Sequence, residues 1–130
     1  MARPKILIVD DDTTIAGMFG VLLEGEGFQT VIVHGTSSAI NIIRREKPDL
    51  VLLDVMVPGV SGLELCSYIR REPDLKDLPV IMVSARHSPE DVQRGLDSGA
   101  TIYLIKPVSR KDLMDGINQA LRKGMEPAAR

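Results

Sequence analysis

Short runs of aliphatic and β-branched residues recur along the chain, separated by longer segments of mixed polarity. Within each run the residues are mostly apolar in succession rather than in alternation, which is typical of strands buried on both faces of a parallel sheet. The runs predict five β-strands: Lys5–Val9, Gln29–Val33, Leu50–Leu53, Val80–Val83 and Ile102–Ile105.

The segments between these runs place apolar residues at helical spacing, so a helix is expected after each strand. Five apolar stripes mark these helices: Ile15, Met18, Phe19, Leu22 and Leu23; Ile40 and Ile43; Leu63, Cys66 and Ile69; Val92 and Leu96; and Leu113, Ile117, Ala120 and Leu121. Strands that alternate with helices predict one doubly wound α/β domain with a five-stranded parallel sheet.

Small polar residues and glycine indicate where several helices begin and end. Thr36 and Ser37 are candidate caps of the second helix, and Ser88 followed by Pro89 suits the start of the fourth. Gly99 is placed to end the fourth helix in a left-handed conformation. We expect the domain to span residues 1–123, with residues 124–130 as a flexible C-terminal tail.

Composition narrows the class of protein. The 130 residues are 44% hydrophobic and 26% charged, which is ordinary for a globular domain. The longest apolar runs are too short to span a bilayer, so no membrane association is expected. The net charge of −2 predicts no direct contact with nucleic acid. Cys66 is the single cysteine, which suits a reducing compartment such as the cytoplasm.

Polar residues stand where the predicted strands end. The first strand is followed by Asp10 and Asp11, the third by Asp54, the fourth by Ser84 and the fifth by Lys106. Ligands of doubly wound sheets bind outside the carboxyl ends of the strands. We therefore expect these side chains to meet at one edge of the sheet.

Clustered carboxylates repel one another unless a cation joins them. Oxygen ligands of this kind suit Mg²⁺. The charges of Asp10, Asp11 and Asp54 are then balanced by Mg²⁺ and Lys106 together, so the site is able to admit an anionic phosphoryl donor. In this interpretation Asp54 is the nucleophile, while Mg²⁺ and Lys106 neutralise charge on the transferred group.

Four segments of the sequence resemble a known family. They read "ILIVDDD", "VLLDVMVPGVSG", "VIMVSA" and "YLIKP", and they resemble, in the same order, conserved blocks of the bacterial response-regulator receiver domains of two-component signal transduction, such as chemotaxis regulators. The resemblance covers nearly the whole chain. It implies a flavodoxin-like fold with strand order 2-1-3-4-5.

The resemblance also implies roles for single residues. Asp10 and Asp11 are the acidic pair that holds Mg²⁺, together with Asp54 and the backbone carbonyl of Met56. Asp54 accepts the phosphoryl group, which Ser84 and Lys106 bind. Tyr103 is the aromatic switch position, and the Lys106–Pro107 peptide bond is expected to be cis.

The same resemblance predicts partners and a signal. A sensor histidine kinase or phosphotransfer protein is the expected donor, and the downstream protein or output domain is not named by the sequence. Phosphorylation is expected to draw Ser84 inward, to let Tyr103 turn, and to reshape the surface of the fourth helix, fifth strand and fifth helix. That surface is also a candidate for a phosphorylation-dependent homodimer.

Met56 and Arg86 are expected to control how long the phosphoryl group lasts. Each lies two residues beyond a site residue, and in the family these positions flank the path of the hydrolytic water. A bulky apolar and a long basic side chain predict slow self-dephosphorylation. Beyond this and its own phosphotransfer, the chain is not expected to be an enzyme.

Two other functions fit parts of the sequence. Asp10, Asp12 and Thr14 read as the D-x-D-x-T motif of haloacid-dehalogenase-type phosphohydrolases, with Asp10 as nucleophile and no required role for Asp54. Asp12 fits an N-cap equally well. The second alternative is a receiver-like binding module that works without phosphate, against which the intact set of acidic residues and Lys106 argues.

Overall fold

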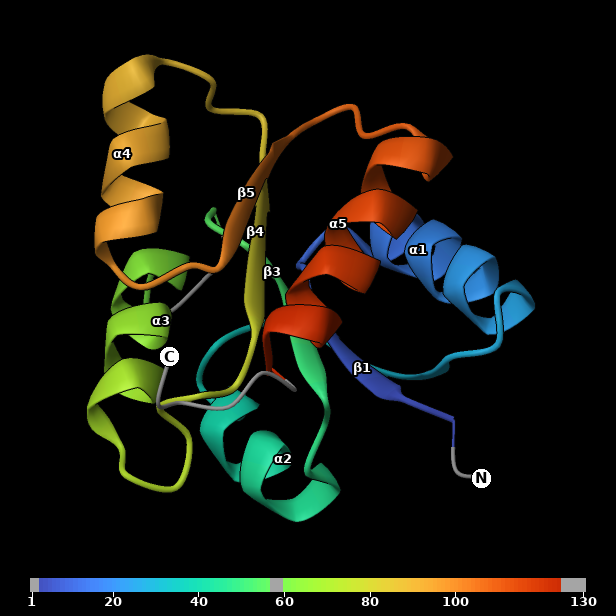
Figure 1. Cartoon of the computed structure of the whole chain (residues 1–130), viewed down its shortest axis with the longest axis horizontal. Helices are drawn as coiled ribbons and strands as arrows, with labels where there is room; N and C mark the ends of the chain where they lie inside the picture. Colours follow the sequence, from blue (N-terminus) through green and yellow to red (C-terminus); the bar gives the residue numbers. More distant parts are fainter. Residues whose placement is uncertain (1–2, 57–59, 125–130) are drawn as a thin grey trace.

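A computed structural model describes residues 3–56 and 60–124 of the chain, and these residues form five strands and five helices in strict alternation (Figure 1). The strands are β1 (Lys5–Val9), β2 (Gln29–Val33), β3 (Leu50–Asp54), β4 (Val80–Ser84) and β5 (Ile102–Ile105). The helices are α1 (Thr13–Gly25), α2 (Ala39–Glu46), α3 (Gly62–Arg71), α4 (Pro89–Asp97) and α5 (Arg110–Gly124). All five predicted strands are confirmed, and β3 and β4 each include one polar residue more than predicted.

The strands form one parallel sheet in the order β2-β1-β3-β4-β5, which confirms the predicted fold class. The three inner strands are buried almost throughout, whereas β2 and β5 at the edges are half-buried. The inner strands are apolar in succession because both of their faces are covered.

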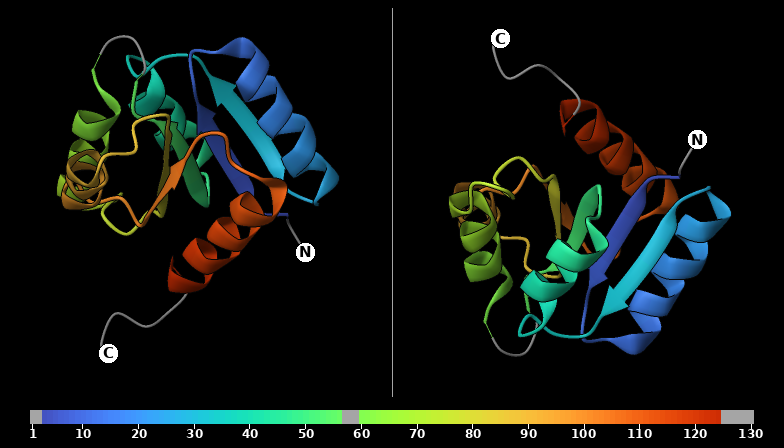
Figure 2. Two further views of the ribbon diagram at one scale, coloured as in Figure 1. Left: turned by 90° about the horizontal axis from the view of Figure 1, so that it is seen from above. Right: turned by 90° about the horizontal axis from the view of Figure 1, so that it is seen from below.

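Helices cover the sheet on both sides (Figure 2). On one side α1 and α5 pack on Ile6, Ile8 and Leu52, and on the other α2 and α3 pack on Leu7 and Leu53. Because successive strand residues point to opposite faces, each inner strand contributes to both cores. Cys66 belongs to the core on the side of α2 and α3, where burial raises the pKa of its thiol. This agrees with a packing role for the residue.

The predicted apolar stripe of α1 is partly wrong. Met18 is 66% exposed, and the residues that α1 buries are Ala16, Gly20 and Leu23. The helix is apolar on most of its circumference, so hydrophobicity alone does not select the buried face. Small residues select it instead: a Cβ at Gly20 would lie 3.3 Å from the Cδ1 atom of Ile32, so the glycine lets α1 approach β2 closely.

The predicted helix ends are confirmed for α4 and wrong for α2. The Ser88 hydroxyl accepts a hydrogen bond from the Asp91 amide at 3.1 Å, and Gly99 has a positive φ of 112°. The N-cap of α2 is Ser38, without a side-chain capping bond. The Thr36 hydroxyl donates to the Val60 carbonyl oxygen at 2.5 Å and so ties the loop before α2 to the loop before α3.

The predicted apolar stripe of α4, Val92 and Leu96, is partly wrong. Leu96 is 40% exposed, and Gly95 is the buried residue of this helix.

The helix α5 packs as predicted through Leu113, Ile117 and Ala120. It extends to Gly124, and the remainder of the predicted tail, 125–130, lies outside the described residues. Among the described residues, no helix has the length and apolarity that crossing a membrane requires.

Candidate functional site

Three carboxylates meet where β1 and β3 end, as predicted. Asp10 follows β1 and Asp54 is the last residue of β3, and these strands are neighbours in the sheet. Carboxylate oxygens of Asp10, Asp11 and Asp54 all lie within 4.8 Å of one another. Asp10 and Asp54 are buried, while Asp11 is exposed. The cluster therefore has a buried floor and one solvent-facing ligand.

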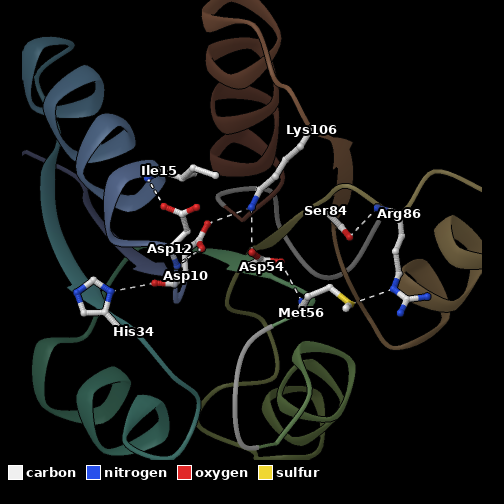
Figure 3. Close-up of polar contacts among 9 residues, drawn as sticks. All are labelled: Asp10, Asp12, Ile15, His34, Asp54, Met56, Ser84, Arg86 and Lys106. Carbon is white, nitrogen blue, oxygen red and sulfur yellow. Dashed lines mark hydrogen bonds and ion pairs between the residues drawn. The ribbon is translucent and has the colours of Figure 1, made fainter.

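The ammonium group of Lys106 completes the cluster (Figure 3). It lies 2.9 Å from Oδ2 of Asp54 and 3.2 Å from Oδ2 of Asp10. Burial by itself lowers the pKa of Lys106, but its hydrogen bond to Asp54 and the negative charges of Asp54 and Asp10 outweigh burial, so the pKa is raised. Lys106 therefore carries its charge at neutral pH. The Lys106–Pro107 peptide bond is cis.

The Asp10 carboxylate is held by its own loop. Its Oδ1 accepts a hydrogen bond from the Asp12 amide at 2.9 Å. Burial and the neighbouring charge of Asp54 raise the pKa of Asp10, and the Asp12 amide and Lys106 oppose this. Desolvation is the largest of these effects. Burial destabilises the charged form of this carboxyl group, and a cation that binds beside it stabilises that form.

Asp54 is fixed by the turn that follows it. Its Oδ1 accepts a hydrogen bond from the Met56 amide at 2.9 Å. The start of α3 packs closely against the end of β3: a Cβ at Gly62 would lie 2.7 Å from the Asp54 carbonyl oxygen, so a glycine is required there. The Gly62 amide also donates to the Val55 carbonyl at 3.1 Å. Gly62 ends the segment "VLLDVMVPGVSG", which carries the resemblance, although no role of its own was predicted for it.

Ser84 and Arg86 form the opposite wall of the site (Figure 3). Ser84 is buried at the end of β4, and its hydroxyl accepts a hydrogen bond from the Arg86 amide at 3.1 Å. The Arg86 guanidinium Nε lies 2.9 Å from the Met56 sulfur. The two residues predicted to control phosphoryl lifetime are thus in direct contact.

Tyr103 joins β5 to the loop after β4. Its hydroxyl donates to the Arg86 carbonyl oxygen at 2.9 Å, and its ring packs against the core on the α3 side of the sheet. The predicted switch residue is therefore linked, through the backbone of Arg86, to the segment that carries Ser84.

The structure resolves the two interpretations of Asp12. Its carboxylate Oδ1 accepts a hydrogen bond from the Ile15 amide at 3.0 Å, so Asp12 is the N-cap of α1 (Figure 3). His34, to which the sequence assigned no role, has its Nδ1 3.0 Å from the Asp10 carbonyl oxygen and supports the same loop. With Asp12 engaged in capping, the D-x-D-x-T interpretation loses its second carboxylate.

The donor set of this site fits a hard divalent cation. Mg²⁺ binds oxygen ligands at about 2.1 Å, so opposite ligands stand about 4.2 Å apart. Carboxylate oxygens of the three residues lie within 4.8 Å of one another, so small side-chain movements, above all of the exposed Asp11, bring them to one ion. With Lys106 as the neighbouring cation, a divalent ion brings the formal charge of the four side chains to zero.

Comparison with known proteins agrees with this geometry. The family model of the response regulator receiver domain matches residues 6–118. The chain is 39% identical over 127 residues to the DNA-binding response regulator MtrA of Mycolicibacterium smegmatis, covering 98% of the chain and 54% of that protein. It is 42% identical over 123 residues to the phosphate regulon transcriptional regulatory protein PhoB of Escherichia coli, covering 95% and 53%. The chain thus spans about half the length of the curated relatives it matches.

Solved structures give the same result. A CheY-like response regulator receiver domain protein from Methanospirillum hungatei JF-1 superposes with a TM-score of 0.86 at 32% identity, covering 95% of this chain and 97% of that one. The BeF3-activated N-terminal receiver domain of Klebsiella pneumoniae RstA superposes with a TM-score of 0.84 at 30% identity, covering 91% and 98%. The chain therefore belongs to the response regulator receiver domain family of two-component signalling.

Proposed function

We propose that Asp54 is the residue that accepts the phosphoryl group. The observation that carries this proposal is the shared pairing of Lys106 with Asp54 and Asp10 beside the exposed Asp11. A carboxylate at the end of an inner strand, next to a fixed cation and a cation-binding pair, suits nucleophilic attack on phosphorus. Asp10 is the weaker candidate because the D-x-D-x-T motif that would make it the nucleophile has its second carboxylate, Asp12, engaged as the N-cap of α1.

The transfer conserves atoms and charge without further reactants. A carboxylate oxygen of Asp54 forms a new P–O bond while the bond from phosphorus to the donor breaks. With acetyl phosphate as donor, acetate leaves; with a phosphohistidine, the imidazole leaves. The product at Asp54 is an acyl phosphate, and water later breaks the same P–O bond. The protein in this scheme promotes its own phosphorylation and slow dephosphorylation.

Lys106 and Ser84 act on the transferred group. Lys106 already lies 2.9 Å from Asp54 and needs little movement to pair with a phosphoryl oxygen bound there. Ser84 borders the site from the end of β4, with a hydroxyl hydrogen that is not used by its bond from the Arg86 amide. Both groups stabilise charge on the equatorial oxygens of phosphorus.

Asp10, Asp11 and Asp54, with the backbone carbonyl of Met56, are the proposed ligands of Mg²⁺. When bound, the ion supplies positive charge against the repulsion between the carboxylates and the incoming phosphoryl oxygens. Asp11 is the ligand that the folded protein leaves exposed, so it is the residue that a cation from solvent would meet first.

The donor is proposed to be a histidine kinase or phosphotransfer protein that approaches over α1. An apolar hollow of about 460 Å³ opens there between Ile15, Met18, Phe19 and Leu22 of α1 and Pro107 and Val108 after β5. Lys106 lines the same hollow, so a protein seated in it stands next to Asp54. An exposed methionine at position 18 suits an apolar partner surface.

The output is proposed to leave through α4, β5 and α5. Movement of Ser84 toward a phosphoryl group displaces the Arg86 carbonyl, which is the hydrogen-bond partner of Tyr103. On this face Leu96 and Ile105 are exposed apolar residues, which suits a downstream protein or a second copy of the chain. The names of MtrA and PhoB concern proteins about twice as long, so DNA binding is not included in this proposal.

The contact between Met56 and Arg86 supports the proposed long phosphoryl lifetime. Together the two side chains bridge the mouth of the site between the segments that follow β3 and β4. A hydrolytic water that approaches Asp54 from this side meets the bridge first.

The proposed location of the protein is the cytoplasm. Its one cysteine is a buried free thiol, which suits a reducing compartment.

The decisive experiment is labelling with acetyl phosphate in the presence of Mg²⁺, followed by mass spectrometry of peptides. The native protein is expected to gain one phosphoryl group on the peptide that contains Asp54, and Asp54→Asn is expected to gain none. Asp77→Asn, a change at an exposed aspartate remote from the site, is the matched control. A phosphoryl group on Asp10 would support the phosphohydrolase alternative, and no labelling would support a phosphate-independent binding module.

A further inference from the structure

Gly95 is the buried residue of α4, a helix whose residues are all described. The helix otherwise presents polar or partly exposed side chains, and Leu96 beside Gly95 is 40% exposed. Glycine is a poor helix former, so an interior glycine weakens α4. Its backbone here is helical and needs no left-handed conformation. What position 95 requires is therefore space beside the helix rather than an unusual backbone geometry.

The space beside Gly95 is filled by the ring of Tyr103. A Cβ at position 95 would lie 2.5 Å from Cδ2 and 2.7 Å from Cε2 of that ring, and 3.1 Å from the Met82 sulfur. Cβ atoms do not occur as close as 2.5 Å to a ring carbon, so a side chain here forces either the aromatic ring or α4 to move. The missing Cβ creates a notch in α4 that the ring occupies.

The same ring is held at its other end by a hydrogen bond. The Tyr103 hydroxyl donates to the Arg86 carbonyl oxygen at 2.9 Å. Tyr103 thus connects β5, the middle of α4 and the loop that leads from Ser84 into α4. Neither the loop nor α4 is able to shift without changing a contact of this ring.

We propose that Gly95 is a positioning residue for Tyr103. The notch sets the position of the ring, and a movement of the ring therefore displaces α4. A ring that leaves the notch removes the buried contact of α4, and a side chain in the notch expels the ring. The placement concerns the unphosphorylated protein and stands without the proposed phosphorylation. The consequence of this placement for signalling, by contrast, rests on the proposed phosphorylation of Asp54.

The chain offers a matched control for this inference. Gly17 also lies inside a helix, α1, and the position of its Cβ has nothing within 4 Å. Gly17→Ala therefore reports the gain in helix propensity alone. Gly95→Ala combines the same gain with the clash against Tyr103.

The test is an NMR comparison of proteins carrying ¹³C-labelled tyrosine rings. The chain has two tyrosines, so the ring signals of Tyr68 and Tyr103 are assignable by substitution. Gly95→Ala is expected to shift the Tyr103 ring signals and leave those of Tyr68, whereas Gly17→Ala shifts neither. Unchanged Tyr103 signals in folded Gly95→Ala would overturn the inference.

A second measurement keeps the inference testable if Gly95→Ala folds poorly. In the native background Gly95→Ala is expected to raise the equilibrium constant for unfolding, and in a Tyr103→Ala background to lower it, as Gly17→Ala does. An equal increase in both backgrounds would refute the role of the ring. Beryllofluoride with Mg²⁺ then tests the consequence: the amide shifts of α4 seen in the native protein are expected to shrink in Gly95→Ala. No shifts in the native protein would instead count against the proposed function.

Discussion

The ammonium group of Lys106 lies 2.9 Å from a carboxylate oxygen of Asp54, although the two residues are 52 positions apart in the sequence. Asp54 ends β3 and Lys106 follows β5, and the strand β4 lies between these two strands in the sheet. The long lysine side chain spans this separation and also reaches Asp10 at 3.2 Å. One ammonium group, held between two buried carboxylates, thereby balances part of the charge of both.

Replacing Lys106 by methionine is expected to slow phosphorylation from acetyl phosphate by about 10²-fold, because a fixed charge that stabilises the transferred group is lost. The rate is measured by the appearance of phosphoprotein at saturating Mg²⁺. Lys111→Met is the control, since Lys111 pairs with Asp115 on the surface of α5. A Lys106→Met protein that is folded and labels at the native rate would rule out the assigned role.

Removal of divalent cations by EDTA is expected to stop labelling of Asp54. Asp11→Ala is expected to raise the Mg²⁺ concentration for half-maximal labelling at least about tenfold, with little loss of stability because Asp11 is exposed. Asp12→Asn removes a neighbouring charge that belongs to the helix cap, and it should leave the Mg²⁺ requirement near the native value. Equal effects of the two substitutions would mean that bulk charge, rather than ligation, attracts the ion.

Loss of the α1 cap is expected to affect stability and not chemistry. Asp12→Ala should lower the free energy of unfolding by about 1 kcal/mol, because the Ile15 amide loses its acceptor. Asp12→Asn retains a capping oxygen and should cost less. Urea unfolding gives the stabilities, and acetyl phosphate labelling should stay within twofold, roughly, of native in both variants. Loss of labelling in Asp12→Asn would revive a catalytic role for this residue.

The contact between Met56 and Arg86 predicts that their effects on dephosphorylation are coupled. Met56→Ala and Arg86→Ala should each speed the loss of phosphate, since each opens the same bridge to water. The double variant should be less than multiplicatively faster, because the first substitution already breaks the contact. Rates are followed after removal of the donor. Arg71→Ala, at an exposed position of α3, is the control. Independent effects of Met56→Ala and Arg86→Ala would show that the two residues act separately.

Arg70 is expected to be a stabilising residue remote from the chemistry. Its guanidinium donates to the carbonyl oxygens of Gly99, Leu78 and Lys76 and thereby joins the loops before β5 and β4. Arg70→Gln should lower the free energy of unfolding by about 2 kcal/mol, since three carbonyl oxygens, two of them in partly buried hydrogen bonds, lose their donors. Arg71→Gln, at the exposed neighbouring position, is the control for charge and should fall within about 0.5 kcal/mol of native in urea unfolding.

Some features of the fold followed directly from local sequence. Strands such as β4, predicted over Val80–Val83, were visible because a short, uninterrupted apolar run is typical of a strand buried on both faces. Ser88 before Pro89 marked a helix start through its own hydrogen bonding. The buried face of α1 was predicted wrongly for the converse reason. Where Met18 and Ala16 are both apolar, the choice between them depends on how closely the neighbouring strand approaches.

By itself the sequence determined the alternation of strands and helices and the chemical groups at the strand ends, because both depend on residues adjacent in the chain. Only the tertiary structure decided which of those groups meet. The pairing of Lys106 with Asp54, the engagement of Asp12 in a helix cap and the fit of Tyr103 against Gly95 each depend on strand order and interatomic distance. Such distances are set by packing between residues far apart in the chain, and a pattern along one dimension does not contain them.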